Sequence, residues 1–445
     1  MRVQGFSSLR GKRVLLLQGP VGPFFNRLGA DLRAAGADVY KVNFNGGDWF
    51  FSSKKDFDRV YNYRGRPEDW DEYFRQLVKR TGVEIVMLFG DCRPIHREVS
   101  RISRECGVEV GVFEEGYLRP DYITLERNGV NSHSALPQDP DFFLRFKDQP
   151  VPPVMRLGST FRYAALWAML YYVMASLLKP VFWRYRHHRP LSWTEGAFWV
   201  LSYLRKNHYR NHEAGTQEVL CGPHSKDYFL VALQSCTDAQ ISAHSNYSSV
   251  EAFIEEVVRS FAGHAPADVL LVLKHHPLDR GYADYSLLIK SLAEQYGLAG
   301  RCYYIHDQHL PALLDHARGV VTINSTVGLS ALQHKSPVKV CGRAIYDIKG
   351  LTFQGNLDQF WLQAPLHVPN PALYRGFKNY LVLHTQHNGS FYKQLPGMVF
   401  RSGINWTDRG DIRAIPSVSE PKSVPVPMPV NQQVRPLHRL PRTIM

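Results

Sequence analysis

The sequence predicts an α/β protein built from two Rossmann-like domains that face each other across a cleft. Apolar segments of strand length alternate with amphipathic segments of helix length, this series occurs twice along the chain, and polar or turn residues follow the strands. The 445 residues, 44% hydrophobic and 21% charged, are enough for two or three domains with sizeable cores. This composition excludes a collagen, a coiled coil and a disulfide framework.

The first half opens with a strand, a glycine turn and a helix. The apolar run 14–17 leads into Gly19 and Pro20, residues 24–35 have helical spacing, and 38–42 reads as the next strand. Further along the chain we expect strands at 84–89 and 109–113 and a helix at 97–106. These elements predict a Rossmann-like domain over residues 1–155, ending near the prolines at 150, 152 and 153.

The second half repeats this alternation and predicts another Rossmann-like domain over residues 216–400. Its expected strands are 228–233, 269–273, 302–305, 319–323 and 338–341, and its expected helices are 249–262, 285–296, 310–316 and 327–332. In such sheets ligands bind at the carboxyl ends of the strands, so both domains would direct their strand ends to a shared cleft.

The segment between the halves, residues 156–215, differs from both. Residues 163–178 carry no charge, while Arg162, Lys179 and a cluster of three Arg and two His at 184–189 flank them. A membrane-spanning helix needs about 20 apolar residues, so we expect an interfacial helix that associates with a membrane, with a buried helix as the alternative. The proline-rich tail, residues 401–445, is predicted to be disordered.

The charge balance favours an anionic partner. Fifty-three Lys and Arg against 40 Asp and Glu give a formal charge of +13, which suits an acidic membrane or a phosphorylated substrate. We expect no nucleic-acid partner, because no dense Lys/Arg block is present. The six Cys are scattered, as expected of reduced cytosolic thiols, and the apolar run 14–17 is too short for a signal peptide.

Two motifs of the second half suit phosphate binding. Lys274, His276 and Pro277 follow an expected strand and Arg280 adds a cation, although a strand-capping His pair is the alternative. Asn324, Ser325 and Thr326 follow another strand and open a helix, where hydroxyl groups and free amides can bind an anion. The alternative for this second motif is an ordinary helix cap.

Acidic residues follow two expected strands of the first half. Glu114 and Glu115 stand ahead of a glycine, and one of them could be a nucleophile or general base, with Arg119 holding negative charge. The alternative is a solvated turn. Asp91 and His96 are similarly placed and could act as acid, base or acceptor ligand, or simply cap a turn.

Other polar residues are candidates for contact with an acceptor or a sugar. The glycine turn lacks the phosphate-loop patterns, and we expect it to shape a substrate loop. For Gln234, Asp238, Gln240 and His244, a role in the core or in a turn is equally compatible with the spacing. No metal-binding pattern occurs among the 19 His, so we expect no metal. The candidate contacts are Gly22, Arg93, His96, Gln234, Asp238, Gln240 and His244.

Three longer stretches carry a family resemblance. FEEGYLRPDYITLE at 113–126, KHHPLDRGY at 274–282 and TINSTVGLSAL at 322–332 resemble capsule polysaccharide biosynthesis proteins of the KpsS type, which are bacterial retaining β-Kdo glycosyltransferases. Shorter matches extend the resemblance over nearly the whole chain except the tail. It implies the glycosyltransferase B architecture, CMP-Kdo as donor and a phosphatidylglycerol-type lipid as acceptor, starting the Kdo linker of a capsule.

The resemblance also assigns roles to residues. His276 with Pro277, and Ser325 with Thr326, would bind the cytidine monophosphate. Related β-Kdo transferases have Glu-Asp-Gly where this chain has Glu-Glu-Gly, so Glu115 replaces the family's candidate nucleophile with a longer side chain.

Because CMP-Kdo is itself β-configured, a β product means net retention through two displacements. Arg119 would hold the Kdo carboxylate, and a monophosphate leaving group needs no metal and no cofactor.

The implied location is the cytoplasmic face of the inner membrane, with a second Kdo transferase and the capsule export complex as possible partners. Two alternatives remain open. The chain could transfer from another activated donor, such as CDP-glycerol or a UDP sugar, or it could be a non-catalytic capsule assembly or export adaptor.

Overall fold

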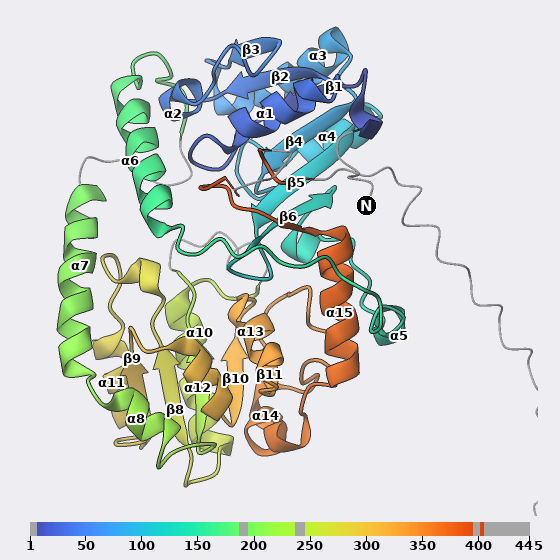
Figure 1. The fold of residues 1–445 in the computed structure, drawn as a ribbon. Coiled ribbons are helices and arrows are strands. Elements are labelled where there is room, and N and C mark those ends of the chain that lie inside the picture. Colours follow the sequence, from blue (N-terminus) through green and yellow to red (C-terminus); the bar gives the residue numbers. More distant parts are fainter. Residues whose placement is uncertain (1–6, 187–194, 236–244, 395–400, 405–445) are drawn as a thin grey trace, which may run out of the picture. The chain divides into compact units, whose positions relative to one another are not determined.

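The computed structural model describes residues 7–186, 195–235, 245–394 and 401–404. Within them the chain forms a seven-stranded and a five-stranded sheet, each packed between helices (Figure 1). The predicted class, α/β with two Rossmann-like halves, is therefore confirmed.

The first sheet has the strand order β12-β6-β5-β4-β1-β2-β3. Its parallel strands are nearly continuous apolar runs because helices cover both of their faces, which gives two hydrophobic clusters, one on each face. The strands are β1 (Arg13–Leu16), β2 (Asp38–Asn43), β3 (Arg59–Asn62), β4 (Ile85–Phe89), β5 (Glu109–Glu115), β6 (Tyr122–Arg127) and β12 (Gln386–Asn388). The helices are α1 (Phe24–Ala34), α2 (Gly46–Phe50), α3 (Trp70–Thr81) and α4 (Val99–Glu105).

The second sheet is entirely parallel and has the order β11-β10-β7-β8-β9. The five parallel strands of each sheet follow the doubly wound order, which reverses between β1 and β4 and between β7 and β10. The strands are β7 (Tyr228–Ala232), β8 (Leu270–Lys274), β9 (Cys302–Ile305), β10 (Gly319–Thr322) and β11 (Val338–Val340). The helices are α8 (Thr216–Cys221), α10 (Val250–His264), α11 (Ser286–Gln295), α12 (Leu310–His316), α13 (Val327–Gln333), α14 (Leu357–Gln363) and α15 (Pro371–His384).

The expected domain limits were residues 155 and 400. The positions at which the chain passes from one sheet to the other differ from these limits. Phe143, in the short helix α5 (Pro140–Leu144), packs against Phe377 of α15 in the core of the second sheet. In the other direction, β12 pairs antiparallel with β6, and Phe391 and Ile404 are buried in the core of the first sheet. The edge of β6 has unpaired backbone groups without this strand, so a C-terminal segment returns to complete the first sheet.

Two helices connect the halves: α6 (Phe161–Leu177) and α7 (Glu195–His212) (Figure 1). One side of α6 is part of the protein core, since Tyr171 and Ala175 are buried and the Tyr171 hydroxyl donates to Asp48 Oδ1 at 2.9 Å. A Cβ on Gly47 of α2 would lie 2.6 Å from the Tyr171 ring, so this glycine permits the close approach of α6. No helix among the described residues is long and apolar enough to cross a membrane.

Candidate active site

The two adjacent acids lie at the carboxyl end of β5, as the sequence indicates. Because neighbouring strand residues point to opposite faces of a sheet, Glu114 and Glu115 occupy different environments. Glu115 Oε1 accepts a hydrogen bond of 2.8 Å from the hydroxyl of Tyr392, which the returning C-terminal segment supplies. Tyr392 is in turn fixed from α6, where the Trp167 indole nitrogen donates to its carbonyl oxygen at 2.9 Å.

Glu114 titrates near neutrality. Burial raises the pKa of Glu114 to about 7, and the nearby charges of Glu115 and Asp91 also raise it. A hydrogen bond of 2.9 Å from the Glu115 backbone amide and the positive charge of Arg93 act in the opposite direction. A carboxyl group that titrates near neutrality can exchange protons as a general acid or base at physiological pH.

Asp91 is buried and supports a neighbouring loop. Its Oδ2 accepts hydrogen bonds from the Val130 backbone amide at 3.2 Å and from His133 Nδ1 at 3.0 Å. The expected acid or base role of Asp91 stays a prediction, while its contacts give it a positioning role. They fix residues 130–134, which follow β6.

Glu126 fixes the same loop from the other side. It accepts hydrogen bonds from the hydroxyls of Tyr117, at 2.8 Å, and Ser134, and burial raises the pKa of this carboxyl to about 7. The Tyr117 hydroxyl also accepts from the Asn131 backbone amide at 2.7 Å. Asn131 has a φ of 56°, a left-handed conformation that Asn tolerates better than most residues.

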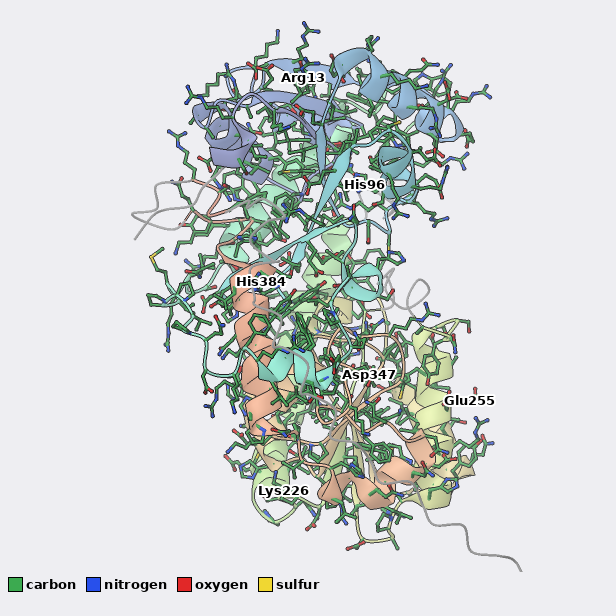
Figure 2. The ribbon with its side chains drawn as sticks, turned by 90° about the vertical axis from the view of Figure 1, so that its right-hand side faces the viewer. Arg13, His96, Lys226, Glu255, Asp347 and His384 are labelled. Atoms are coloured by element: carbon green, nitrogen blue, oxygen red, sulfur yellow. The ribbon has the colours of Figure 1, made fainter. Side chains whose placement is uncertain are left out.

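Three further first-half candidates, His96, Gly22 and Arg119, contact neighbouring loops or α6. His96 is fully buried (Figure 2), its Nδ1 lies 2.8 Å from the Gly90 carbonyl oxygen, and burial lowers its pKa to about 3, so the ring is neutral. A Cβ on Gly22, whose φ is 109°, would lie 2.9 Å from Trp167, so this turn packs on α6. Arg119 is exposed and donates to the Gly116 carbonyl oxygen at 3.3 Å.

Arg93 holds the loop after β1. It donates to Gln18 Oε1 at 3.2 Å and to the Gly19 carbonyl oxygen at 3.1 Å. A contact between Arg93 and an acceptor stays a prediction.

In the second half, two of the expected phosphate-binding cations are already engaged. Lys274 is buried, donates to the His306 carbonyl oxygen at 2.7 Å and has a pKa lowered by burial. Arg280 forms an ion pair with Asp307. His276 is partly exposed and caps the turn that Pro277 begins, with Nδ1 accepting from the Leu278 amide at 3.3 Å.

The strand ends of β7 and β10 are joined by a reciprocal pair of hydrogen bonds. Gln234 Nε2 donates to Asn324 Oδ1 at 2.8 Å, and Gln234 Oε1 accepts from the Asn324 backbone amide at 3.1 Å. Ser325 Oγ accepts from the Val327 amide at 3.2 Å, whereas Thr326, in the N-cap position of α13, makes no side-chain cap bond. Helix α13 has seven residues and matches the helix expected at 327–332 to within one residue. Asp238, Gln240 and His244 lie outside the described residues.

A cleft of about 240 Å³ lies between residues of the two halves. Asn131, Ser132, Ser134 and Gln138 line it from the first half, and residues 342–345 and Asp347 (Figure 2) from the second. A smaller hollow lined by Asn324 and Thr326 shares Asn131 and Arg343 with this cleft.

Arg343 and Asn131 are residues that the sequence reading missed. Arg343 is an exposed cation after β11, and Asn131 Nδ2 is buried and has no hydrogen-bond partner. The strand at 338–341 was expected, and Arg343 follows its carboxyl end. This position at a strand end is the signal that could have predicted Arg343 as a site residue.

One group of described residues could offer three metal ligands: Asp91, Cys92 and His133. Burial raises the pKa of the Cys92 thiol to about 12, which opposes the thiolate form that binds metals. Asp91 and His133 are also bonded to each other, so hydrogen bonding accounts for the group without a metal.

These features together define a class of protein. Two doubly wound halves, with acids at the strand ends of one and a His and hydroxyl residues at those of the other, form the glycosyltransferase B architecture. Residues 84–392 match the family model described as capsule polysaccharide biosynthesis protein. The chain belongs to this family.

Two relatives cover most of the chain. It is 44% identical over 385 residues to the capsule polysaccharide export protein KpsS of Escherichia coli, with 86% of this chain and 98% of the relative covered. It is 41% identical over 394 residues to the capsule polysaccharide modification protein LipB of Neisseria meningitidis serogroup B, with coverages of 86% and 92%.

Solved structures with similar folds are more distant. The β-Kdo 2,4 transferase KpsC of Thermosulfurimonas dismutans is 16% identical, with a TM-score of 0.36 over 72% of this chain and 83% of the other. HepE of Anabaena, solved with UDP-glucose, is 12% identical, with a TM-score of 0.34 over 84% and 95%. The fold assignment rests on the two sheets described above.

Proposed function

We propose that this protein transfers Kdo from CMP-Kdo, with retention, to a phosphatidylglycerol-type lipid and so starts the poly-Kdo linker of a capsular polysaccharide. The observation that carries the proposal is the pair of acids at the end of β5. One is held by a tyrosine hydroxyl, and burial raises the pKa of the other to about 7. Family membership supports a role in capsule biosynthesis, and the sequence resemblance supports Kdo as the sugar.

Two displacements fit this pair of acids. Glu115 attacks the anomeric carbon of Kdo, a glycosyl ester bond forms, and the bond to CMP breaks with its electron pair leaving on the phosphate. The lipid hydroxyl then attacks the same carbon and releases the Glu115 carboxylate. The proton of the lipid hydroxyl passes to Glu114.

The donor phosphate is assigned to residues at the strand ends of the second half. His276 with Pro277, and Asn324, Ser325 and Thr326, are the proposed contacts for the cytidine monophosphate. Lys274 and Arg280 support these loops through His306 and Asp307. Because Lys274 and Arg280 are engaged in this way, Arg343, which lines the cleft, is the cation that we propose to face the phosphate or the Kdo carboxylate. The mechanism requires no metal and no cofactor.

A lipid acceptor places the enzyme on the cytoplasmic face of the inner membrane. A second Kdo transferase, which would extend the product, and the capsule export complex are the partners that this role implies.

The test is incubation of the purified full chain with CMP-Kdo and a fluorescent phosphatidylglycerol analogue, followed by mass spectrometry of lipid and protein. We expect a lipid heavier by one Kdo, and Glu115→Gln should bind CMP but give no product. Product from UDP or CDP donors instead of CMP-Kdo would replace the proposed donor. A chain that binds no nucleotide and gives no product would contradict the proposal and favour the adaptor role.

A further inference from the structure

The outward side of α6 is an apolar surface. Leu166, Met169, Val173 and Leu177 recur every three or four residues and therefore share one face of the helix. They are 42%, 48%, 50% and 67% exposed. Exposed apolar patches of this kind mark interaction sites more often than ordinary surface.

This exposure coexists with firm packing of the opposite face. Tyr171 is buried against α2 and hydrogen-bonded to Asp48 and Asn45, and Trp167 donates to the carbonyl oxygen of Tyr392. The inner face alone attaches the helix to the first half. The outer apolar face leaves about half or more of the surface of Met169, Val173 and Leu177 in contact with solvent.

Helix α7 repeats the arrangement on the second half. On its inner side Phe198 stacks on Tyr282, with ring centroids 4.9 Å apart, and Arg205 donates to the Arg280 carbonyl oxygen at 2.8 Å. On its outer side the apolar residues Val200, Tyr203 and Leu204 are 61%, 66% and 59% exposed. Both halves thus carry an outward apolar helix face.

The charges around these helices identify what would cover them. No Asp or Glu occurs between Asp148 and Glu195, whereas six Lys and Arg do. Of these, Arg162, Lys179, Arg184 and Arg186 are exposed, and Arg184 lies over the ring of Trp183, which is 68% exposed. Apolar and aromatic side chains that are flanked along the chain by cations fit the interface of an anionic bilayer, where each cation is attracted by the headgroups.

We infer that the outer faces of α6 and α7 dock this protein in the plane of an anionic lipid surface. The inference stands independently of the reaction proposed above, because it rests on exposure and charge alone. Helix α6 also carries Trp167, which holds Tyr392 and through it Glu115. The helix that meets the lipid is thus joined to a candidate catalytic acid by two hydrogen bonds.

The experiment is sedimentation of the full chain with vesicles of phosphatidylethanolamine containing 30% phosphatidylglycerol, and with vesicles of phosphatidylcholine alone. An apolar variant carries Leu166→Ser and Val173→Ser, and a charge variant carries Arg162→Glu, Lys179→Glu and Arg184→Glu. The control carries Leu287→Ser and Leu366→Ser, which are 84% and 82% exposed on other elements. Circular dichroism and CMP binding report whether each variant is folded.

The wild type and the control should bind anionic vesicles and dissociate as salt rises. The apolar variant should bind about 10-fold more weakly, and the charge variant about 30-fold or more. Equal binding of wild type and both variants would overturn the inference, as would equal binding to phosphatidylcholine. The inference would also be overturned if the wild type formed a soluble dimer that did not bind vesicles and if the apolar variant were monomeric. That result would assign the apolar face to contact with a second copy of the chain. Vesicle binding without Kdo transfer would leave the inference intact and contradict only the proposed reaction.

Discussion

Replacing Tyr392 with Phe removes one hydroxyl group while retaining the ring. That hydroxyl donates to Glu115 Oε1 at 2.8 Å, and burial together with the Glu115 charge raises the pKa of Tyr392 well above 10, so it is a donor throughout the working pH range. A hydrogen bond to a charged group contributes about 1.5 to 3 kcal/mol. If Glu115 reacts as a carboxylate, losing this bond should slow transfer about 10- to 100-fold.

The assay is kcat and KM for CMP-Kdo as a function of pH. We expect kcat to fall with KM little changed, a result that general loosening of the fold would not produce. Tyr228→Phe is the matched control, because its hydroxyl donates to the Leu313 carbonyl oxygen at 2.6 Å in the core of the second half. This control should lower Tm but leave kcat unchanged. A Tyr392→Phe enzyme with wild-type kcat would refute the role assigned to this tyrosine.

Three further predictions concern the acids and the cleft. The pKa of Glu114 is raised from 4.5 to about 7 in the folded state, so its contribution to the free energy of unfolding decreases as pH rises from about 4.5 to 7. Base-assisted transfer should instead become faster up to about pH 7. Glu114→Gln should abolish the pH dependence of stability and of rate over this range, and an unchanged rate profile would contradict the base role. Arg343→Gln should weaken CMP-Kdo binding about 3- to 10-fold in calorimetry, while Lys349→Gln, an exposed cation of the same half, should not; equal affinities would remove Arg343 from the site. Asp91→Asn should destabilise the fold by about 1 to 3 kcal/mol and speed hydrogen exchange at Val130 with transfer only partly reduced; a stable but inactive variant beside a fully active Glu115→Gln would make Asp91 the catalytic acid.

Several features of this protein follow from the sequence alone. The two sheets of parallel strands were predictable because their strands are continuous apolar runs, a local property that burial on both faces requires. The positions of Glu114, Glu115 and His276 at strand ends were predictable for the same reason, since each follows such a run directly. Periodicity likewise gave the helix at 310–316, which is α12.

Contacts between distant segments had no local signal. β12 has only three residues, and its pairing with β6 joins residues about 260 positions apart in the chain, so it could not be read from spacing. The same return of the chain brings Tyr392 to Glu115, which decides how the two acids differ. For the uncharged segment at 163–178, the sequence left an interfacial helix and a buried helix as alternatives. Only its packing on α2 separated a buried side from an exposed one.

The sequence determined which residue types stand at the strand ends, because alternation of apolar strands and helices is encoded within short windows of chain. The tertiary structure decided which of those residues keep their charge available. Lys274 and Arg280 read as phosphate ligands, yet each is engaged by a partner from the loop after β9, whereas Arg343 came to line the cleft. Hydrogen bonding and burial depend on neighbours distant in sequence, and it is these neighbours that set the pKa and the role of a side chain.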